Sequence, residues 1–499
     1  MRRLHFCLRA APAALFLFSL PSLPLLAQEQ LGLRLERYAG IWGAGLNPSQ
    51  TAFNPNNWEV NLFAADLFFE NSYAYLHNTS LPNALRNTDQ LISVTDLTSE
   101  RPLAPDDIVL DFFDAKRRMH GVLQARVAGP GFSFRFNENN VVGLITSVRA
   151  GISSYRIPEI LAYRTISDLP RNQAIDIPAT KLQGMAWSEI GLHYSRRHTD
   201  GDLHTAWGLT PKFLLGAEGF YTEAESNFDY TQRQGDTVAF GRARWEYGLT
   251  TGNLNDPNTT PAGYHTQGRG FGLDLGFSWA QPEAADEDNY AWRLGVSLLD
   301  LGFLRYKRPA EQHRIVFDTV VTISNNNFPP RSDPKLVLQD ASQAFLGNAT
   351  QSLQARAFSI GLPTALSVQF DMQIAPLMYV GAALIQRIPL QRHSLQRPST
   401  LAVTPRFEHR WVSVSFPIVL DDWRSLRMGL AGRFGFLAFG TDNLNSFFQK
   451  EKLTGGDVYI GLKINGFSIH FKEKEGAYKG RGNARTSKQK LRKIKCYQF

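Results

Sequence analysis

The sequence predicts an all-β fold: a transmembrane antiparallel β-barrel of about 14 strands with long extracellular loops and an N-terminal lead-in that resembles a plug. Three observations support this prediction. Apolar and polar residues alternate along the expected strands, an export signal precedes them, and the connections between them alternate between short and long. Near the middle of the chain, small or polar residues alternate with Phe271, Leu273, Leu275, Phe277 and Trp279. Successive strand side chains point to opposite faces, so one face is apolar and the other polar.

An export signal occupies residues 1–27. Three arginines within the first nine residues precede an apolar stretch from Ala10 to Leu26, and Ala27 supplies a small residue for cleavage. This order is typical of a secretory signal peptide. A signal anchor is the alternative, but Pro21 and Pro24 break the apolar stretch before it reaches the length of a membrane helix.

The charge is unevenly distributed. The chain has a net charge of +8, and residues 472–499 alone hold seven lysines, three arginines and two glutamates. Residues 28–471 hold 40 basic and 43 acidic residues, so we infer no nucleic-acid partner from the overall basicity. Cys496 is the only cysteine after the signal, and no intramolecular disulfide is expected.

The alternating runs define the barrel domain, residues 58–471, after a lead-in or plug segment at residues 28–57. The expected strands are 58–76, 121–136, 141–155, 185–198, 203–222, 266–280, 290–306, 355–372, 376–388, 400–409, 411–420, 426–434, 436–444 and 457–471. Their connections alternate between short turns and long loops, as in outer-membrane barrels. The run 237–248 is expected to form an extracellular hairpin. A soluble periplasmic β-protein is the alternative fold.

Charged residues fall on or beside the polar faces of these strands. The candidate lumenal residues are Asp274, Arg293, Asp300, Asp371, Arg406, Glu408, Arg433 and Lys463. One interpretation is a lattice of ion pairs that keeps the barrel rigid. The other is a charged constriction that selects solutes. The sequence leaves both open.

The end of the barrel carries an expected assembly signal. Phe467, Ile469 and Phe471 alternate on the last strand, and we assign to them the aromatic signal that the barrel-insertion machinery reads. Residues 472–499 form a basic periplasmic tail. Its closing residues Cys496, Tyr497 and Phe499 are candidates for docking an acidic periplasmic partner or peptidoglycan.

Several blocks resemble an uncharacterised β-barrel family of Bacteroidota-type bacteria, a domain-of-unknown-function family with the general form of the FadL, PorV and PorP barrels. The blocks are residues 45–49, 208–216, 270–276, 294–302, 362–367, 404–408 and 440–444. The resemblance implies a barrel in the outer membrane, in contact with its lipid. It implies no activity and no catalytic residues.

Two functions follow as hypotheses. The first is passage of a small solute, a hydrophobic one being an option, across the outer membrane. The second is a scaffold that docks secretion or surface-attachment machinery. No phosphate-binding loop, zinc-protease motif or nucleophile elbow is present, so we expect neither an enzyme nor a cofactor or metal site.

Overall fold

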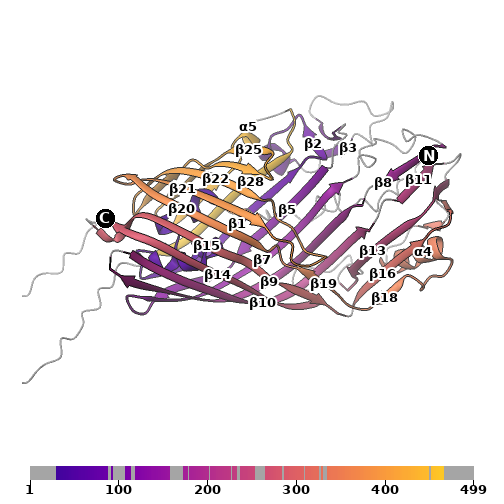
Figure 1. Cartoon of the computed structure of the whole chain (residues 1–499). Helices are drawn as coiled ribbons and strands as arrows, with labels where there is room; N and C mark the ends of the chain where they lie inside the picture. The colour runs from indigo at the N-terminus through magenta and orange to yellow at the C-terminus, as the bar shows by residue number, and fades with distance from the viewer. Residues whose placement is uncertain are drawn as a thin grey trace, which may run out of the picture. The chain divides into compact units, whose positions relative to one another are not determined.

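The computed structural model describes residues 30–87, 91–93, 107–113, 119–157, 172–177, 179–201, 203–225, 228–232, 237–252, 265–283, 286–307, 309–324, 327–329, 334–448 and 451–465. Within these residues the chain forms a closed barrel of 14 antiparallel strands (Figure 1). The ring closes where the first strand pairs with the last, from Glu59 opposite Asn465 to Glu70 opposite Gly455. Closure pairs every strand edge within the wall.

Four strands of the wall are interrupted, and each of these carries two labels. The 14 strands of the wall follow one another in sequence order. In ring order they are β1 (Trp58–Asn71), β5 (Met119–Ala128) with β6 (Gly131–Arg135), β7 (Asn140–Ile157), β9 (Lys181–Asp200), β10 (Leu203–Ala224), β14 (Gly268–Glu283), β15 (Asp286–Tyr306), β19 (Phe358–Gly361) with β20 (Ala365–Ala375), β21 (Met378–Arg387), β22 (Thr400–Glu408), β23 (Val412–Ser415) with β24 (Ile418–Asp421), β25 (Ser425–Met428) with β26 (Leu430–Phe434), β27 (Leu437–Thr441) and β28 (Gly455–Asn465). These strands confirm the predicted fold class.

Six short turns lie at one end of the barrel, and the long connections lie at the other, together with the tight turn from β24 to β25. Tight turns join β6 to β7, β9 to β10, β14 to β15, β20 to β21, β22 to β23 and β26 to β27. The long connections carry β2 (Ala74–His77), α3 (Leu81–Arg86), β3 (Leu91–Ser93), β4 (Ile108–Phe112), β8 (Ala174–Ile177), β11 (Phe228–Gln232), β12 (Thr237–Phe240), β13 (Ala243–Thr250), β16 (Ala310–Phe317), β17 (Val321–Ser324), α4 (Pro334–Leu346), β18 (Leu353–Ala355) and α5 (Asn445–Phe448). We call these the short-turn end and the long-loop end.

The prediction that residues 237–248 form a hairpin is wrong. β12 pairs with β11 and β17, whereas β13 pairs with the tip of β10 and with β16. The run is therefore divided between two sheets. β12 pairs locally with the preceding β11, but β17 and β16, from residues 310–324, pair with β12 and β13 in place of a pairing within the run. A sequence pattern carries no sign of these distant partners.

The outer face of the barrel is apolar. Its exposed side chains include Val148, Ile190, Leu192, Phe213, Phe271, Leu275, Phe277, Phe303, Phe370, Val403, Phe407, Phe439 and Ile460. On β14 these alternate with buried Asp274 and Ser278, as the period of two predicts. An apolar band on the outside and polar groups on the inside is the arrangement of a barrel in lipid.

Leu275→Arg tests the register of this face. Leu275 is 40% exposed on the outer wall, so an arginine there is expected to lower the free energy of unfolding in bilayers by about 2–4 kcal/mol. Leu275→Met, which keeps the volume and the apolar character, is expected to change it by less than about 1.5 kcal/mol. Urea unfolding in lipid vesicles measures both. Equal losses would place Leu275 away from the lipid.

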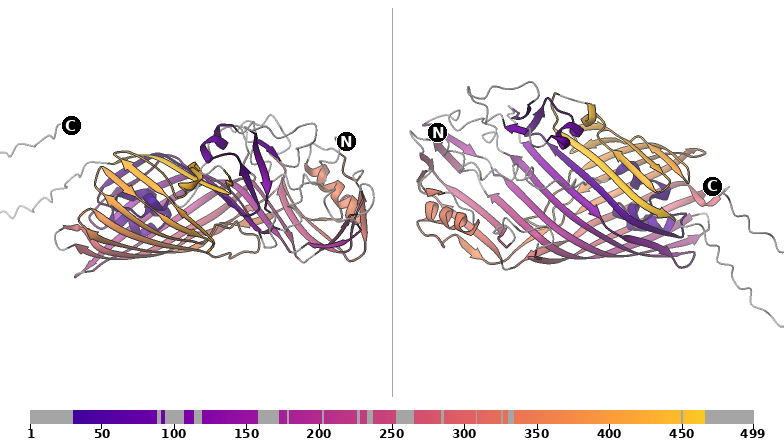
Figure 2. Two further views of the ribbon diagram at one scale, coloured as in Figure 1. Left: turned by 90° about the horizontal axis from the view of Figure 1, so that it is seen from above. Right: turned by 180° about the vertical axis from the view of Figure 1, so that it is seen from behind.

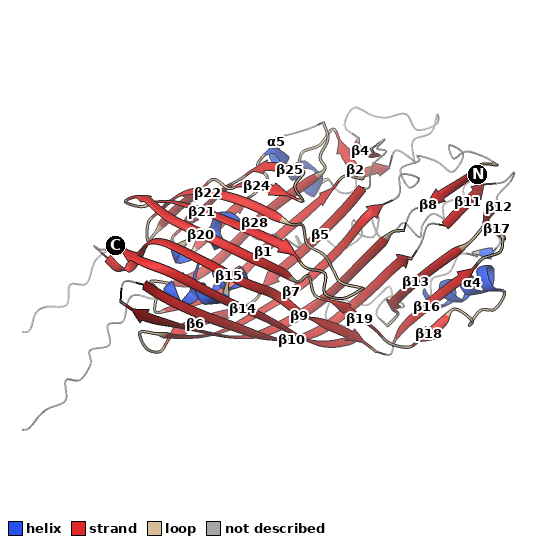
Figure 3. Cartoon of the chain, in the orientation of Figure 1, coloured by secondary structure: helices blue, strands red, loops and turns tan. Residues whose placement is uncertain are grey.

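An inner segment, residues 30–57, lies within the ring of strands (Figures 2 and 3). It contains α2 (Leu31–Arg34) and two 3-10 helices, η2 (Arg37–Gly45) and η3 (Pro48–Phe53). Most of its side chains are buried, polar ones included. In η3, Asn47 caps the first turn by accepting a hydrogen bond from the Ser49 N–H, and Pro48 occupies the first helical position, where its missing N–H is not needed.

In the described part of the chain, no helix has the length and apolar character needed to cross a membrane. The predicted signal peptide, the assembly signal at Phe467, Ile469 and Phe471, and the tail with Cys496, Tyr497 and Phe499 lie outside the described residues.

Candidate functional site

The inner segment is held to the wall by buried charges at the short-turn end. Glu36 of this segment accepts a hydrogen bond from Arg433 Nε at 2.9 Å and another from the Ser413 hydroxyl. Lys463 donates to the backbone oxygens of Tyr38 and Ala39, each at 2.8 Å. The two predicted lumenal cations Arg433 and Lys463 therefore bind the inner segment rather than line an open pore.

A second group of predicted residues links the wall to the same segment. Arg406 pairs with Asp371 at 2.6 Å and with Glu408 at 2.8 Å, and all three side chains are almost fully buried. Arg293 donates to the Leu35 carbonyl at 3.1 Å and lies 3.5 Å from Asp371. Both arginines share Asp371, so this end of the lumen is filled by ion pairs.

Farther along η3, neutral hydrogen bonds continue the attachment. The Ser49 and Ser278 hydroxyl oxygens are 2.6 Å apart, and Thr51 Oγ1 lies 2.7 Å from His193 Nε2. Asn47 Nδ2 donates to Gln369 Oε1 at 2.9 Å. Contacts to β9, β14 and β20 distribute the attachment over distant parts of the ring.

The connection between β21 and β22, residues 388–399, passes over the lumen at the long-loop end. We call it the crossing loop. Leu395 belongs to the same buried apolar cluster as Met185 and Trp187 of β9, and the Gln396 N–H donates to Ser153 Oγ of β7 at 3.0 Å. In ring order β7 and β9 are separated from β21 and β22 by several strands on either side. The loop therefore reaches the facing wall.

Charges attach the crossing loop to the barrel mouth. Arg392 pairs with Glu225 at 2.6 Å and with Glu223 at 3.1 Å. The His393 ring stacks on Tyr221 with 3.8 Å between centroids. Burial lowers the pKa of His393, and the carboxylates of Glu246 and Glu223 act against this shift. The ring lies 3.2 Å from Glu246, which it can reach by a hydrogen bond from Nε2.

Between the inner segment and the crossing loop lies the central chamber. Its lining residues are Arg34, Ala44, Gly45, Asp66, Gln124, Ala125, Arg126, Ile145, Arg149, Ala150, Trp187, Glu189, Lys212, Asp274, Leu299, Asp300, Pro363, Leu395 and Arg397. They come from the inner segment, from the crossing loop and from the wall. We call the inner segment and the crossing loop the two closing segments. The free space is about 50 Å³, which is enough for a few water molecules.

Asp300 is the point where the chamber's charges converge. Arg149 donates to both of its carboxylate oxygens, at 2.8 and 3.0 Å, and Lys212 lies 2.8 Å from it. Arg397 of the crossing loop also pairs with Asp300. Asp274 lies 2.7 Å from Lys212 and accepts a hydrogen bond from the Asp300 N–H, also at 2.7 Å.

The backbone around Asp300 adopts an unfavourable conformation and an irregular register that bring these charges together. Asp300 has φ +52, a conformation that residues other than glycine rarely adopt. The register between β14 and β15 shifts between Leu273 and Leu275, at the level of Asp274. Such bulges redirect side chains. Here the Asp300 carboxylate is reached at once by cations from β7, β10 and the crossing loop.

All eight predicted lumenal residues are buried in the structure. The sequence pattern did not single out the partners that explain them: Glu36, Arg149, Lys212 and Arg397. Arg149 and Lys212 lie on the inward faces of their strands, so the same period-two count could have found them. Glu36 and Arg397 lie outside the barrel strands, where no periodicity marks them.

A model of a family of unknown function, DUF5723, matches residues 52–442. The chain belongs to this family. The match begins in η3 and ends shortly after β27, so it spans the chamber's wall and the crossing loop. No curated protein matches this DUF5723 protein.

Solved structures resemble the DUF5723 barrel weakly. A deletion mutant of the TodX monoaromatic hydrocarbon channel is 9% identical over 85% of this chain and 94% of that chain, with a TM-score of 0.37. The P. putida toluene transporter TodX is 10% identical over 87% and 95%, with a TM-score of 0.34. A Pseudomonas aeruginosa FadL homologue is 9% identical over 88% and 98%, with a TM-score of 0.22. Likeness at this level carries no inference about the solute.

The charged groups that line the chamber are arranged largely as ion pairs. No group of three or more His, Cys, Asp or Glu side chains in this part of the chain has the geometry to hold a metal ion. The chamber's carboxylates instead accept hydrogen bonds from arginine and lysine.

Proposed function

We propose that this barrel is an outer-membrane passage for a small polar solute, closed in the described state by the inner segment and the crossing loop. The observation that carries the proposal is the central chamber, because both closing segments and the wall contribute to its lining. Movement of either segment would connect the chamber to one side of the membrane. The apolar outer band supports the location in the outer membrane.

The charge of the chamber sets the class of solute. Its lining includes five basic side chains, Arg34, Arg126, Arg149, Lys212 and Arg397, and four acidic ones, Asp66, Glu189, Asp274 and Asp300. An apolar solute would remove charged groups from water without replacing their hydrogen bonds, which is unfavourable. We therefore propose a polar solute rather than the hydrophobic one considered from the sequence.

A scaffold is the second candidate, and one observation favours it. At the long-loop end, β13, β16 and β18 extend the sheet beyond β10 (Figure 1), and a separate sheet orders β17, β12, β11 and β8. Sheet edges of this kind can add a strand from another protein. In a scaffold the filled lumen is a permanent core, and neither closing segment needs to move.

Two engineered disulfides separate these functions, each in a Cys496→Ser background. Ser49→Cys with Ser278→Cys fixes the inner segment to β14, since the native hydroxyl oxygens are 2.6 Å apart. Gly151→Cys with Leu395→Cys fixes the crossing loop to β7, since a Cβ on Gly151 would lie 3.5 Å from Leu395 Cγ. The single-cysteine variants are the controls.

Flux of arabinose and glutamate into proteoliposomes is the measurement. The passage proposal expects flux in the reduced protein, its loss on oxidation in at least one pair, and recovery with dithiothreitol. Equal flux in the oxidised and reduced proteins of both pairs, or no flux in either state, would contradict the passage and favour the scaffold.

A further inference from the structure

Two arginines face each other on the outer wall of the barrel, near its long-loop end. Arg269 of β14 lies directly opposite Arg305 of β15 in the antiparallel ladder. Both are exposed, on the same face as the lipid-facing Phe271 and Phe303. Directly opposite side chains on a sheet are about 4.5–5.5 Å apart at Cβ, so two like charges in this place repel each other.

No acid neutralises this pair from the adjacent strands. The other neighbour of Arg269 in the ladder is Leu215, and the other neighbour of Arg305 is Ser359. Neither arginine forms an ion pair with another residue in the described ranges. Lys307, also exposed, follows two residues after Arg305 and adds a third positive charge.

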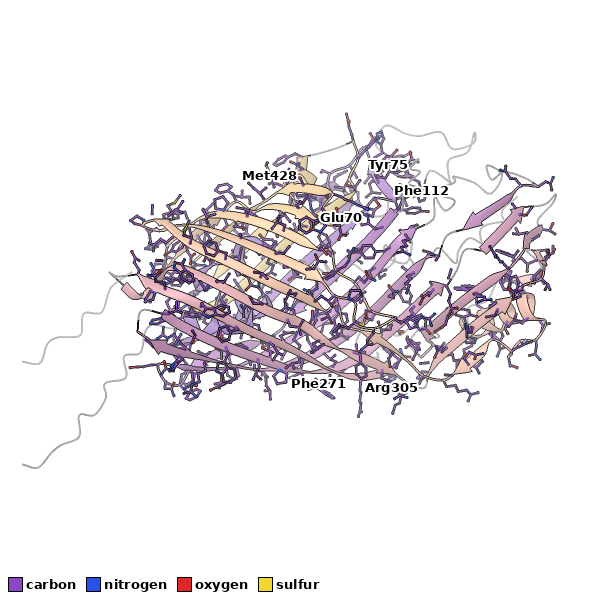
Figure 4. The ribbon with its side chains drawn as sticks, viewed as in Figure 1. Glu70, Tyr75, Phe112, Phe271, Arg305 and Met428 are labelled. Carbon is purple, nitrogen blue, oxygen red and sulfur yellow. The ribbon has the colours of Figure 1, made fainter. Side chains whose placement is uncertain are left out.

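An aromatic row lies immediately below the arginines, toward the middle of the barrel. Phe213, Phe271 and Phe303 are directly paired across β10, β14 and β15, and they are 49%, 55% and 43% exposed. Figure 4 shows Phe271 and Arg305 projecting from the outer wall, with Arg305 nearer the long-loop end. The surface thus passes from apolar to cationic within two residues along each strand.

We infer that Arg269 and Arg305 bind the phosphate group of a phosphorylated lipid in the leaflet at the long-loop end, with its acyl chains against the aromatic row. Arginine forms paired, charge-assisted hydrogen bonds with phosphate. The phosphomonoester of a lipid such as lipid A offers more negative charge than the phosphodiester of a zwitterionic head group, whose ammonium group cancels that charge. The phosphate neutralises the repulsion between the two arginines. The apolar row explains why a lipid, and not free phosphate or an acidic protein, is the ligand.

Native mass spectrometry of the full chain in detergent tests this site, with lipid A as the phosphorylated lipid. Phosphatidylethanolamine and inorganic phosphate are the comparison probes. Arg269→Gln combined with Arg305→Gln is expected to weaken lipid A binding by at least about tenfold, through the loss of two charge-assisted contacts. Arg410→Gln, an exposed arginine at the short-turn end, is the matched control and should bind as the native protein does.

A charge reversal separates lipid binding from a purely structural role. Arg305→Glu places a carboxylate opposite Arg269, so the pair becomes attractive. Without lipid A this variant should unfold at a higher temperature than the native protein, and added lipid A should stabilise only the native protein. Undiminished lipid A binding in the double variant would overturn the inference. So would equal affinity for inorganic phosphate or phosphatidylethanolamine, or an acidic protein as the only binding partner.

Discussion

Asp300→Asn is expected to lower the free energy of unfolding of the barrel by about 3–5 kcal/mol, the cost of leaving buried charge without its counter-ion. Asp300 accepts from Arg149, Lys212 and Arg397, so one substitution removes the negative charge that all three share. Asparagine keeps nearly the same shape and tolerates the positive φ of this position. The loss therefore reports charge rather than backbone strain.

Asp422→Asn is the matched control. Asp422 also has a positive φ, +46, but its partner Arg387 is 28% exposed at the side chain, so water can replace part of the ion pair. We expect a loss of about 1 kcal/mol or less there. Urea unfolding in lipid vesicles, followed by tryptophan fluorescence, measures both variants. Equal losses would mean that the three cations at Asp300 are compensated by Glu189 and Asp274 alone.

The strands could be predicted because their signal is local. On β22, Thr400, Ala402, Thr404, Arg406 and Glu408 all face inward, and their spacing of two fixes this face without knowledge of any partner. The same holds for β14 and β28. The lipid on one side and the packed lumen on the other impose the alternation along the whole strand, so the pattern survives errors of a few residues at the ends.

The contacts of the lumen could not be predicted in the same way. Glu36 and Arg433 are 397 residues apart in sequence, and neither position shows which charge it will meet. The crossing loop looks like an ordinary connection, because its contacts depend on Leu395 and Arg397 reaching a wall formed by other strands. The two sequence interpretations, a lattice and a constriction, could be weighed only when these partners were visible.

The ion-pair lattice also determines how firmly the lumen is closed. The inner segment meets the wall through both charged and neutral contacts. Among the charged contacts, the Glu36 carboxylate pairs with Arg433 and accepts a hydrogen bond from the Ser413 hydroxyl. Its side chain is almost fully buried. Glu36→Gln leaves the Arg433 guanidinium in the same buried place with its counter-ion removed, which favours any state in which the segment has moved away.

Glu36→Gln is therefore expected to lower the free energy that favours the closed position of the inner segment by about 3 kcal/mol. This corresponds to about a hundredfold rise in the ratio of open to closed barrels. Single-channel recording in planar bilayers measures this ratio. Glu138→Gln, an exposed acid in the turn between β6 and β7 at the same end, should leave it unchanged. Adding the Ser49→Cys and Ser278→Cys pair should abolish the extra openings on oxidation, because the segment can then no longer leave β14. If Glu36→Gln lowers the unfolding temperature and yet causes no openings, the inner segment is a fixed part of the barrel core and the passage does not run through its position.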